Sequence, residues 1–418
     1  MQKMQNLTEN HPADIRMVPG LKVEKNFLIQ FIFIAGILFI GAINSFNSVI
    51  GALSAILFIF FLCSAFLKNH KKIMLIIVIF SIVMHFYPLL FQIKNYDPFF
   101  VYDINILVKA GTQKLLSGEN PYSTTFYGTE MDAALLKDGP FWISHEKSYF
   151  AMEKFVYPPG IFLLTVPFYL LFSEISVLAL YFVMLILDIL LISTLIKDMQ
   201  KATIALVLLF LNPIFIFSSK FNSIVDFSAF TFLILATFFY LNKNKTLAGI
   251  CFGAFISTKQ FALLAVPFIL FFFLKNNEKK MLIAAFLTIF LIFAPFMLWS
   301  PSDYFNDTIS PIFCSTENCY PNLAEETPVF YSLTPYTHSY DNILTATSAA
   351  LLLASFALIF YKFVKLEKIN LQALFMFSGI FLIIAVFLSK MGLQSYYEFG
   401  LFMVVFAVVL SLKEKENA

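Results

Sequence analysis

Long apolar runs alternate with short polar or charged loops along this chain, and this pattern constrains the fold more than any other feature. Several runs reach about 20 residues, the length that an α-helix needs to cross the hydrocarbon core of a bilayer. Strands of a membrane β-barrel would instead alternate apolar and polar residues. Backbone polar groups in lipid must be satisfied internally, so these runs must be helical. The pattern predicts an all-α, polytopic membrane protein with about twelve transmembrane helices.

Composition supports a membrane protein and excludes several other classes. Hydrophobic residues make up 60% of the chain and charged residues 13%, whereas soluble domains carry about 25% charged residues. The formal net charge of +2 is too small to indicate a nucleic-acid partner. The basic residues lie instead in short loops, where they act as orientation signals. We therefore expect a multi-pass protein of the cell membrane, in contact with membrane lipids.

The polar segments divide the chain into tails, loops and one transmembrane domain. Residues 1–26 lack the short apolar region and small-residue cleavage site of a signal peptide and are expected to form a cytoplasmic tail. Residues 27–412 are expected to form a single transmembrane domain, and residues 413–418 a second cytoplasmic tail. Two long polar intervals, residues 93–160 and 300–342, are expected to be outer loops that carry amphipathic helices.

Basic loops set the expected orientation of the chain. The loops expected in the cytoplasm are Lys68–Lys72, Lys197–Lys201, Lys243–Lys245, Lys275–Lys280 and Lys362–Lys368. The expected spans are residues 26–44, 48–67, 73–92, 161–172, 175–196, 202–217, 224–241, 247–257, 261–274, 281–299, 343–361, 371–389 and 397–412. If residues 247–274 form a hairpin of two short helices, one segment between residues 161 and 217 must fail to cross the membrane.

The path of residues 247–274 is ambiguous. In one interpretation they form a hairpin of two short helices that meets near Lys259 at the outer face. In the other they form one long span with Lys259 inside it. A lysine at mid-bilayer costs at least about 2.5–3.5 kcal/mol, so we prefer the hairpin.

An amphipathic helix is expected near the start of the first outer loop. Its apolar face comprises Ile104, Leu107, Val108, Gly111 and Leu115, which recur at helical spacing. Asp103 lies in its first turn, where the helix dipole favours a carboxylate. Gly118 is suited to cap the helix, and Pro121 prevents its continuation. We expect this helix to lie flat on the membrane surface.

A carboxylate at the outer face of a membrane suits one kind of chemistry. An enzyme at that face has no access to cytoplasmic nucleotide sugars, so it needs a donor carried across on a lipid such as polyprenyl phosphate. Sugar transfer needs a base that takes the proton of the acceptor hydroxyl. It also needs cations or hydrogen-bond donors that hold the departing phosphate.

A set of motifs, in an order typical of one protein family, indicates which class of enzyme would perform this chemistry. The chain carries YD at Tyr102–Asp103, GENPY at Gly118–Tyr122, VYPP at Val156–Pro159 and LNPIFIF at Leu211–Phe217, followed by a Gly-rich segment with an embedded lysine at Leu247–Leu270. This series resembles the GT-C superfamily of lipid-phosphate-sugar-dependent glycosyltransferases. It is most similar to glycosyltransferase family 87, in which polyprenyl-phosphate-mannose-dependent mannosyltransferases predominate.

The resemblance implies roles for individual residues. Asp103 matches the first-loop acid, which implies a catalytic base, and Lys259 matches the embedded lysine, which we assign to the lipid phosphate. Tyr122 and Tyr157 match motif positions that shape the pocket. Family members often carry a polar element after the Asn-Pro element. This chain reads SSKFNSIVD at that place, and either Asn222 or Asp226 could replace the family's polar element.

Other interpretations of these residues stay open at this point. Asp103 could simply be a carboxylate at a helix start, and Asp97 is a rival acid six residues earlier. Lys259 could be a snorkelling or salt-bridged lysine. Tyr397 belongs to a polar, aromatic rim near the last span, which could contact substrates or form an interfacial aromatic belt.

The expected function is transfer of a hexose, with mannose as the first choice, from polyprenyl phosphate to a glycan or glycolipid acceptor at the extracytoplasmic face, with inversion implied by the resemblance. No cofactor is required, although Asp97 and Asp103 could hold a divalent cation. The alternative is a lipid-linked oligosaccharide flippase or other transporter. Cys314 and Cys319 share a polar loop and could form a disulfide or remain thiols.

Overall fold

The computed structural model describes residues 15–16, 22–23, 58–60, 70–95, 103–129, 153–212, 224–309, 341–388 and 394–414. In these ranges the protein is a bundle of α-helices, apart from one two-residue antiparallel ladder in which β1 (Ile15–Arg16) pairs with β2 (Lys22–Val23). The first two expected spans lie outside the described residues, except for the short helical stretch 58–60.

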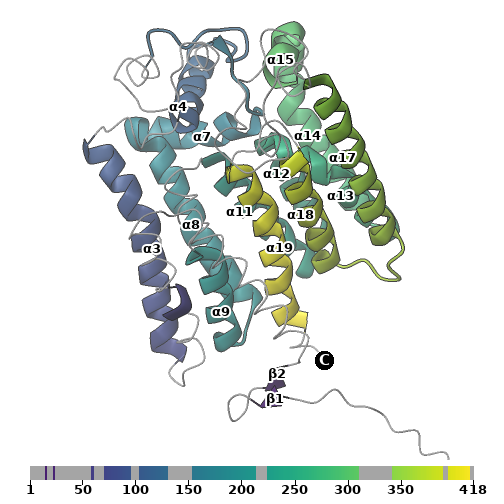
Figure 1. The fold of residues 1–418 in the computed structure, drawn as a ribbon. Coiled ribbons are helices and arrows are strands. Elements are labelled where there is room, and N and C mark those ends of the chain that lie inside the picture. Colours follow the sequence, from purple (N-terminus) through teal and green to yellow (C-terminus); the bar gives the residue numbers. More distant parts are fainter. Residues whose placement is uncertain are drawn as a thin grey trace, which may run out of the picture.

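The helices follow the expected apolar runs closely (Figure 1). The first half contains α3 (His70–Asn95), α4 (Asp103–Leu116), α7 (Gly160–Phe172), the 3₁₀ turn η1 (Ser173–Ile175), α8 (Ser176–Leu195) and α9 (Met199–Phe210). The second half contains α11 (Ile224–Leu241), α12 (Lys245–Thr258), η2 (Gln260–Ala265), α13 (Val266–Lys275), α14 (Lys279–Trp299), α15 (Pro301–Thr308), α17 (Asp341–Val364), α18 (Leu371–Leu388) and α19 (Gln394–Glu414).

Residues 247–274 form the expected hairpin. Lys245, at the start of α12, forms an ion pair with Glu278, at the start of α14. The first turns of both helices therefore lie at the same end of the bundle, and α12 runs parallel to α14. The chain between them must turn at Lys259 and return through η2 and α13. The long-span alternative for this segment is wrong in this structure.

Close packing of α12 on α14 explains why the two helices run side by side. A Cβ atom added to Gly249 would lie 2.4 Å from the carbonyl oxygen of Met281, and one added to Gly253 would lie 2.7 Å from that of Ala285. Only glycine permits such an approach of two backbones. The four-residue spacing on both helices fixes their parallel register.

The bundle has two distinct ends, which we call the site end and the basic end. The site end carries α4, α7 and α15, at the top of Figure 1. Lys259 belongs to this end because its neighbours Ser257 and Gln260 contact the segment that begins α7. The basic end carries the α11–α12 turn, the α13–α14 turn and the α17–α18 loop. Asn276 donates a hydrogen bond to the carbonyl oxygen of Ile369 at 2.9 Å, which joins the last two of these turns.

Helix α7 is the segment that does not cross the bundle. It begins beside Ser257 at the hairpin apex and leads directly into α8. Helix α8 runs parallel to α11, because Ser228 contacts Met184 and Thr231 contacts Asp188. Because α11 starts at the site end, the start of α8 lies there as well. Both ends of α7 therefore lie at the site end, and Figure 1 shows α7 lying across the long helices.

Helix α4 forms where the amphipathic pattern predicts it, but its apolar face has a different partner. Leu107 and Val108 are buried, and the helix packs on α7. A Cβ atom added to Gly111 would lie 2.6 Å from the ring of Phe155. Protein therefore covers the face that we expected to rest flat on lipid, because α7 lies between α4 and the long helices.

Four described helices are long and apolar enough to span a membrane: Ser176–Leu195, Lys279–Trp299, Ala346–Val364 and Leu371–Leu388. Five further apolar helices are shorter, among them both arms of the hairpin. Apart from the β1–β2 ladder, the described part of the chain is therefore helical and contains several candidate membrane spans. The count of about twelve crossings stays a prediction.

Candidate active site

Lys259 lies in the break between α12 and η2 with its side chain buried. Its backbone is extended, with φ −139° and ψ 131°, so α12 ends at Thr258. The side chain forms an ion pair with Asp226 in the first turn of α11, and each residue is only 4% exposed. Burial of an unpaired ammonium costs several kcal/mol, so the carboxylate is what allows Lys259 to be buried at this position.

A second acid reaches the same lysine from the last helix. Glu398 on α19 is 2% exposed and attracts Lys259 electrostatically. The neighbouring Phe399 ring lies 5.1 Å from the Lys259 Nζ, within cation–π range. We call Asp226, Lys259 and Glu398 the Lys259 cluster. It joins the consecutive helices α11 and α12 to the last helix, α19.

Aromatic packing holds these three helices together around the cluster. The ring of Phe399 stacks on Phe255 of α12 at 5.8 Å and on Phe230 of α11 at 5.3 Å between centroids. Phe230 also stacks on Phe402, one turn further along α19, at 3.9 Å. These aromatic residues thus hold α11, α12 and α19 together beside the charged groups.

The segment that enters α7 packs directly against the hairpin apex. The Gln260 side chain donates a hydrogen bond to the carbonyl oxygen of Val156. A Cβ atom added to Gly160 would lie 2.4 Å from the carbonyl oxygen of Ser257. The VYPP motif and its following glycine therefore fix the first turn of α7 beside Lys259.

Tyr122, from the GENPY motif, is buried in the same region. Its hydroxyl donates a hydrogen bond to the carbonyl oxygen of Tyr157 at 2.7 Å. Its ring makes edge contacts with Phe155 at 5.5 Å, Phe296 at 5.9 Å and Tyr304 at 4.8 Å. The structure thus brings the Tyr122 side chain to the Tyr157 backbone, and Tyr122 connects the α4 loop to α14 and α15.

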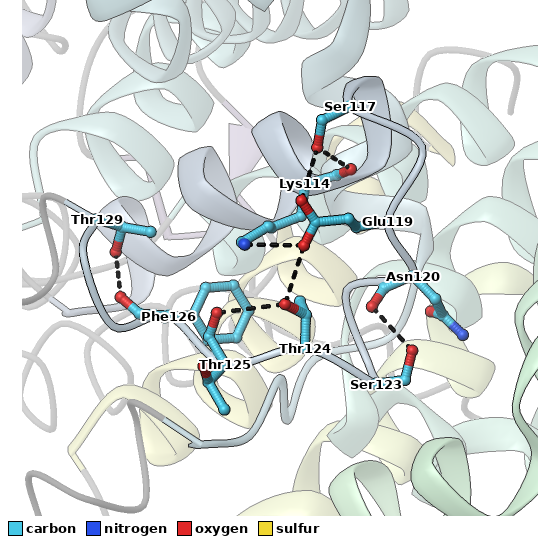
Figure 2. Close-up of polar contacts among 9 residues, drawn as sticks. All are labelled: Lys114, Ser117, Glu119, Asn120, Ser123, Thr124, Thr125, Phe126 and Thr129. Carbon is cyan, nitrogen blue, oxygen red and sulfur yellow. Dashed lines mark hydrogen bonds and ion pairs between the residues drawn. The ribbon is translucent and has the colours of Figure 1, made fainter.

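The outer side of the GENPY loop is a polar network (Figure 2). Glu119 accepts hydrogen bonds from Lys114 at 2.9 Å, Thr124 at 3.1 Å and Ser117 at 3.3 Å. The bonds from Lys114 and Thr124 lower the pKa of Glu119 from its usual value. Gly118 takes the left-handed conformation, φ 83°, that the end of α4 requires. This network fixes the loop from the solvent side.

Asn120 occupies the inner side of the same loop. It is 3% exposed, and its Oδ1 accepts a hydrogen bond from the Tyr122 backbone N–H at 3.2 Å. Its backbone oxygen accepts from the Ser123 N–H at 3.0 Å. Among the described residues the Asn120 Nδ2 has no hydrogen-bond partner. The sequence analysis names this residue only as part of GENPY; an amide inside a motif is the signal that points to it, and its burial follows only from the structure.

Asp307 on α15 is a further buried acid that the sequence did not single out as a site. Its Oδ2 accepts a hydrogen bond from the Phe155 backbone N–H at 2.9 Å. Burial raises the pKa of Asp307 to about 7, although the Phe155 bond and nearby Lys154 act in the opposite direction. Lys154 also donates to the carbonyl oxygen of Asn306 at 3.4 Å. Asp307 therefore anchors α15 to the segment that leads into α7.

The structure describes the remaining expected site residues only in part. Asp103 begins α4, as expected, but its side chain lies outside the described residues. Asp97 and Asn222 also lie outside them. Tyr397 is half-buried on α19, next to Glu398. The structure therefore brings Lys259 together with Asp226 and Tyr122 together with Tyr157, and it places α4 at the same end of the bundle.

Two buried polar groups deeper in the bundle have structural partners. Asp188 accepts a hydrogen bond from Thr231 at 2.8 Å, which joins α8 to α11. His85 contacts the Phe210 carbonyl oxygen through Nε2 at 2.9 Å and the Tyr181 hydroxyl through Nδ1 at 2.8 Å. A carbonyl only accepts, so Nε2 donates, and in the neutral ring Nδ1 then accepts from Tyr181.

Metal ligands do not gather in the described part of the chain. Within those residues no group of three or more His, Cys, Asp or Glu side chains could hold a metal ion. The expected cation position between Asp97 and Asp103 falls on side chains outside the description. Cys314 and Cys319 also lie outside the described residues, and Cys251 is a free, buried thiol.

Part of the chain matches the model of a known protein family. The model of glycosyltransferase family 87 (GT87) matches residues 155–317, which supports assignment of the chain to this family of GT-C-type membrane glycosyltransferases. The match includes Tyr157, Asp226 and Lys259, and begins after Asp103 and Tyr122. Comparison with curated proteins and with solved structures found no match.

Proposed function

We propose that this GT87 protein transfers a hexose, with mannose as the first choice, from a polyprenyl-phosphate carrier to a glycan or glycolipid acceptor at the extracytoplasmic face. Asp103 is the general base and Lys259 the cation for the lipid phosphate. The observation that carries the proposal is the Lys259 cluster, which is buried at the hairpin apex, at the same end of the bundle as α4. Its Asp226 and Lys259 lie within the GT87 match.

The proposed reaction is a single displacement at the anomeric carbon of the donor sugar. The acceptor hydroxyl gives its proton to the Asp103 carboxylate as its oxygen forms the new glycosidic bond. The bond between the anomeric carbon and the phosphate oxygen breaks, and the phosphate leaves with the bonding electron pair. The negative charge that develops on this oxygen is what a buried ammonium stabilises best, because the surroundings exclude water.

The geometry of the cluster adds one condition to this mechanism. Asp226 already holds the Lys259 ammonium, and Glu398 attracts it from α19. One ammonium beside two carboxyl groups leaves no surplus of positive charge for a phosphate. The donor phosphate must therefore share Lys259 with Asp226 or displace it, which makes Asp226 a residue that sets donor affinity.

A transfer assay tests the proposal directly. Purified protein in lipid nanodiscs is supplied with a set of polyprenyl-phosphate hexoses and a panel of glycolipid acceptors, and the wild type is compared with Asp103→Asn. We expect at least about a hundredfold loss of kcat, the lower range for removal of a general base. The donor KM should change little, because the substitution leaves the phosphate contacts intact.

Glu119→Gln is the matched control for this substitution. It removes a carboxylate from the same end of the bundle, at the exposed far end of α4, and should retain wild-type turnover. A folded Asp103→Asn protein with unchanged kcat would reject Asp103 as the base. Wild-type protein that transfers no hexose from any polyprenyl-phosphate donor would reject the donor class.

A transporter function has no specific support. The GT87 match indicates a transferase. The Lys259 cluster, Tyr122, Asn120 and Asp307 all gather at the site end, whereas a translocation path would place polar groups along the spans.

A further inference from the structure

A second polar site lies at the basic end of the bundle, away from the Lys259 cluster. It is a cavity of about 350 Å³ where the turn between α11 and α12 meets the start of α14. The lining residues, which we call the basic pocket, are Asn242, Lys243, Asn244, Lys245, Thr246 and Lys280. Nothing in the proposed transfer reaction uses them.

The charge of the basic pocket suits an anion. Three of its six lining residues are lysines, and none is an acid. Lys245 is neutralised by its ion pair with Glu278, and its Nζ lies 3.5 Å from the centre of the Tyr240 ring. The other two lysines, Lys243 and Lys280, are exposed. Their two positive charges remain available to a ligand in the pocket.

The backbone that forms the pocket is already fixed in position. Lys243 adopts a left-handed conformation, φ 63°, and its N–H donates to the Tyr240 carbonyl oxygen at 3.0 Å. Asn244 caps α12 by accepting a hydrogen bond from the Leu247 N–H at 3.2 Å. The Asn242 amide donates to the Phe238 carbonyl oxygen at 2.9 Å. A ligand would therefore meet a preformed site, which reduces the entropic cost of binding.

An exposed apolar surface begins directly at the pocket. On α14, Ile283, Leu287 and Leu291 follow Lys280 at helical spacing and are 60%, 50% and 68% exposed. On α12, Leu247 is 37% exposed beside the pocket. A charged pocket continuous with an apolar, lipid-facing strip fits a molecule with an anionic head and acyl chains, rather than a soluble anion.

We propose that the basic pocket binds the phosphodiester headgroup of an anionic phospholipid, with an acyl chain along the exposed strip of α14. Lys243 and Lys280 contact the phosphate oxygens, and the amides of Asn242 and Asn244 lie at the rim. Basic pockets between helices at the positively charged end of membrane proteins are suited to such headgroups. This site does not depend on the proposed sugar transfer, and it would stabilise the junction of α11, α12 and α14.

Lipid binding to the purified full-length protein tests this proposal. The protein is delipidated in a neutral detergent and titrated with phosphatidylglycerol, phosphatidylcholine or inorganic phosphate, and binding is followed by native mass spectrometry and by the melting temperature. We expect saturable binding of phosphatidylglycerol and a raised melting temperature. The double variant Lys243→Gln/Lys280→Gln should bind it at least about tenfold more weakly, since each lysine near a lipid headgroup contributes roughly 1 kcal/mol.

A charge-matched control separates this site from general attraction to the basic end. Lys365→Gln/Lys368→Gln removes the same charge from exposed positions near the α17–α18 loop and should keep wild-type binding. Equal weakening in both double variants would overturn the proposal, as would the absence of saturable phosphatidylglycerol binding to the wild type. Inorganic phosphate that reproduces the full rise in melting temperature would show a soluble-anion site instead.

Discussion

The burial of Lys259 is explained by the sequence and the structure together. Its position in an apolar segment makes it a functional candidate. The sequence leaves open whether Lys259 lies inside one long transmembrane span. The structure resolves this through the break in α12 and through two acids from other helices, Asp226 and Glu398. Pairing rather than snorkelling explains how this lysine is buried.

The structural and functional roles of Lys259 can be separated by a pair of variants. Lys259→Met leaves two buried carboxyl groups without their cation, so we expect a loss of roughly 3–5 kcal/mol of stability and of transfer activity. Asp226→Asn/Lys259→Met leaves one such carboxyl group, Glu398, instead of two and should recover part of the stability without the activity. Thermal unfolding in detergent and the transfer assay measure the two effects. An active double variant would show that Lys259 does not serve the donor phosphate.

Asp307 gives the molecule a pH-dependent contact between α15 and the entrance to α7. Its pKa is about 7 in the folded protein and 3.8 ordinarily, because burial favours the neutral acid. Between these values the folded state holds a proton that the unfolded state has lost, so stability falls as the pH rises from about 4 to about 7. Above that window the contribution is constant.

Asp307→Asn should remove this contribution. The amide stays neutral at every pH, and its oxygen can still accept the hydrogen bond from Phe155. Relative to wild type, the variant should melt at a higher temperature at pH 8, and the difference should shrink toward pH 5. The measurement is the melting temperature of both proteins across this range. Parallel curves would show that Asp307 does not titrate there.

At the scale of elements, the hairpin and α7 together create the site end. Helix α7 stays at that end because α12 stops at Thr258 and Gly160 lets the two backbones meet at Ser257. Apolar periodicity could predict both helices, but it could not determine which of the short runs fails to cross. That depended on close backbone contacts that no single segment encodes.

Gly160→Ala tests this contact. A methyl group there would lie 2.4 Å from the Ser257 carbonyl oxygen, so α7 must shift away from the hairpin apex. We expect a destabilisation of about 1–3 kcal/mol, the usual cost of overpacking, and a clear loss of transfer activity. Melting temperature and kcat report the two effects.

Gly128→Asn is the comparison for this variant. Gly128 has a positive φ of 77° and open space around it, and asparagine tolerates that conformation better than other residues. This substitution should leave stability and activity close to wild type. If both glycine variants behaved alike, the contact between α7 and α12 would not be the cause.

At the scale of the whole molecule, the two ends of the described helix bundle carry different kinds of residues. The site end holds buried acids, Lys259 and aromatic contacts, and the basic end holds the lysine-rich turns. Basic loops favour the cytoplasmic side of a membrane. The orientation proposed for transfer, with the site end outside, follows from this separation.

Labelling from one side of the membrane tests this orientation. In a cysteine-free background, Ser123→Cys in the exposed GENPY loop should react with a membrane-impermeant maleimide in intact cells. Lys243→Cys, at the basic end, should react only after the membrane is permeabilised. The measurement is the labelled fraction before and after permeabilisation. The reverse pattern would place the site end in the cytoplasm and exclude the proposed lipid-linked donor pathway.

The sequence alone predicted a helical membrane protein, most helix positions and a resemblance to GT87, because apolar run length, loop charge and motif order are local properties of the chain. It also gave Lys259, Tyr122 and Tyr157 as candidate site residues. Only the tertiary structure decided that α12 and α13 form a hairpin, that α7 covers α4, and that Asp226 and Glu398 meet at Lys259. These depend on contacts between segments that are separated in the sequence, such as Gly111 with Phe155 and Lys259 with Glu398. Such pairings follow from how helices pack and cannot be read from any one of them.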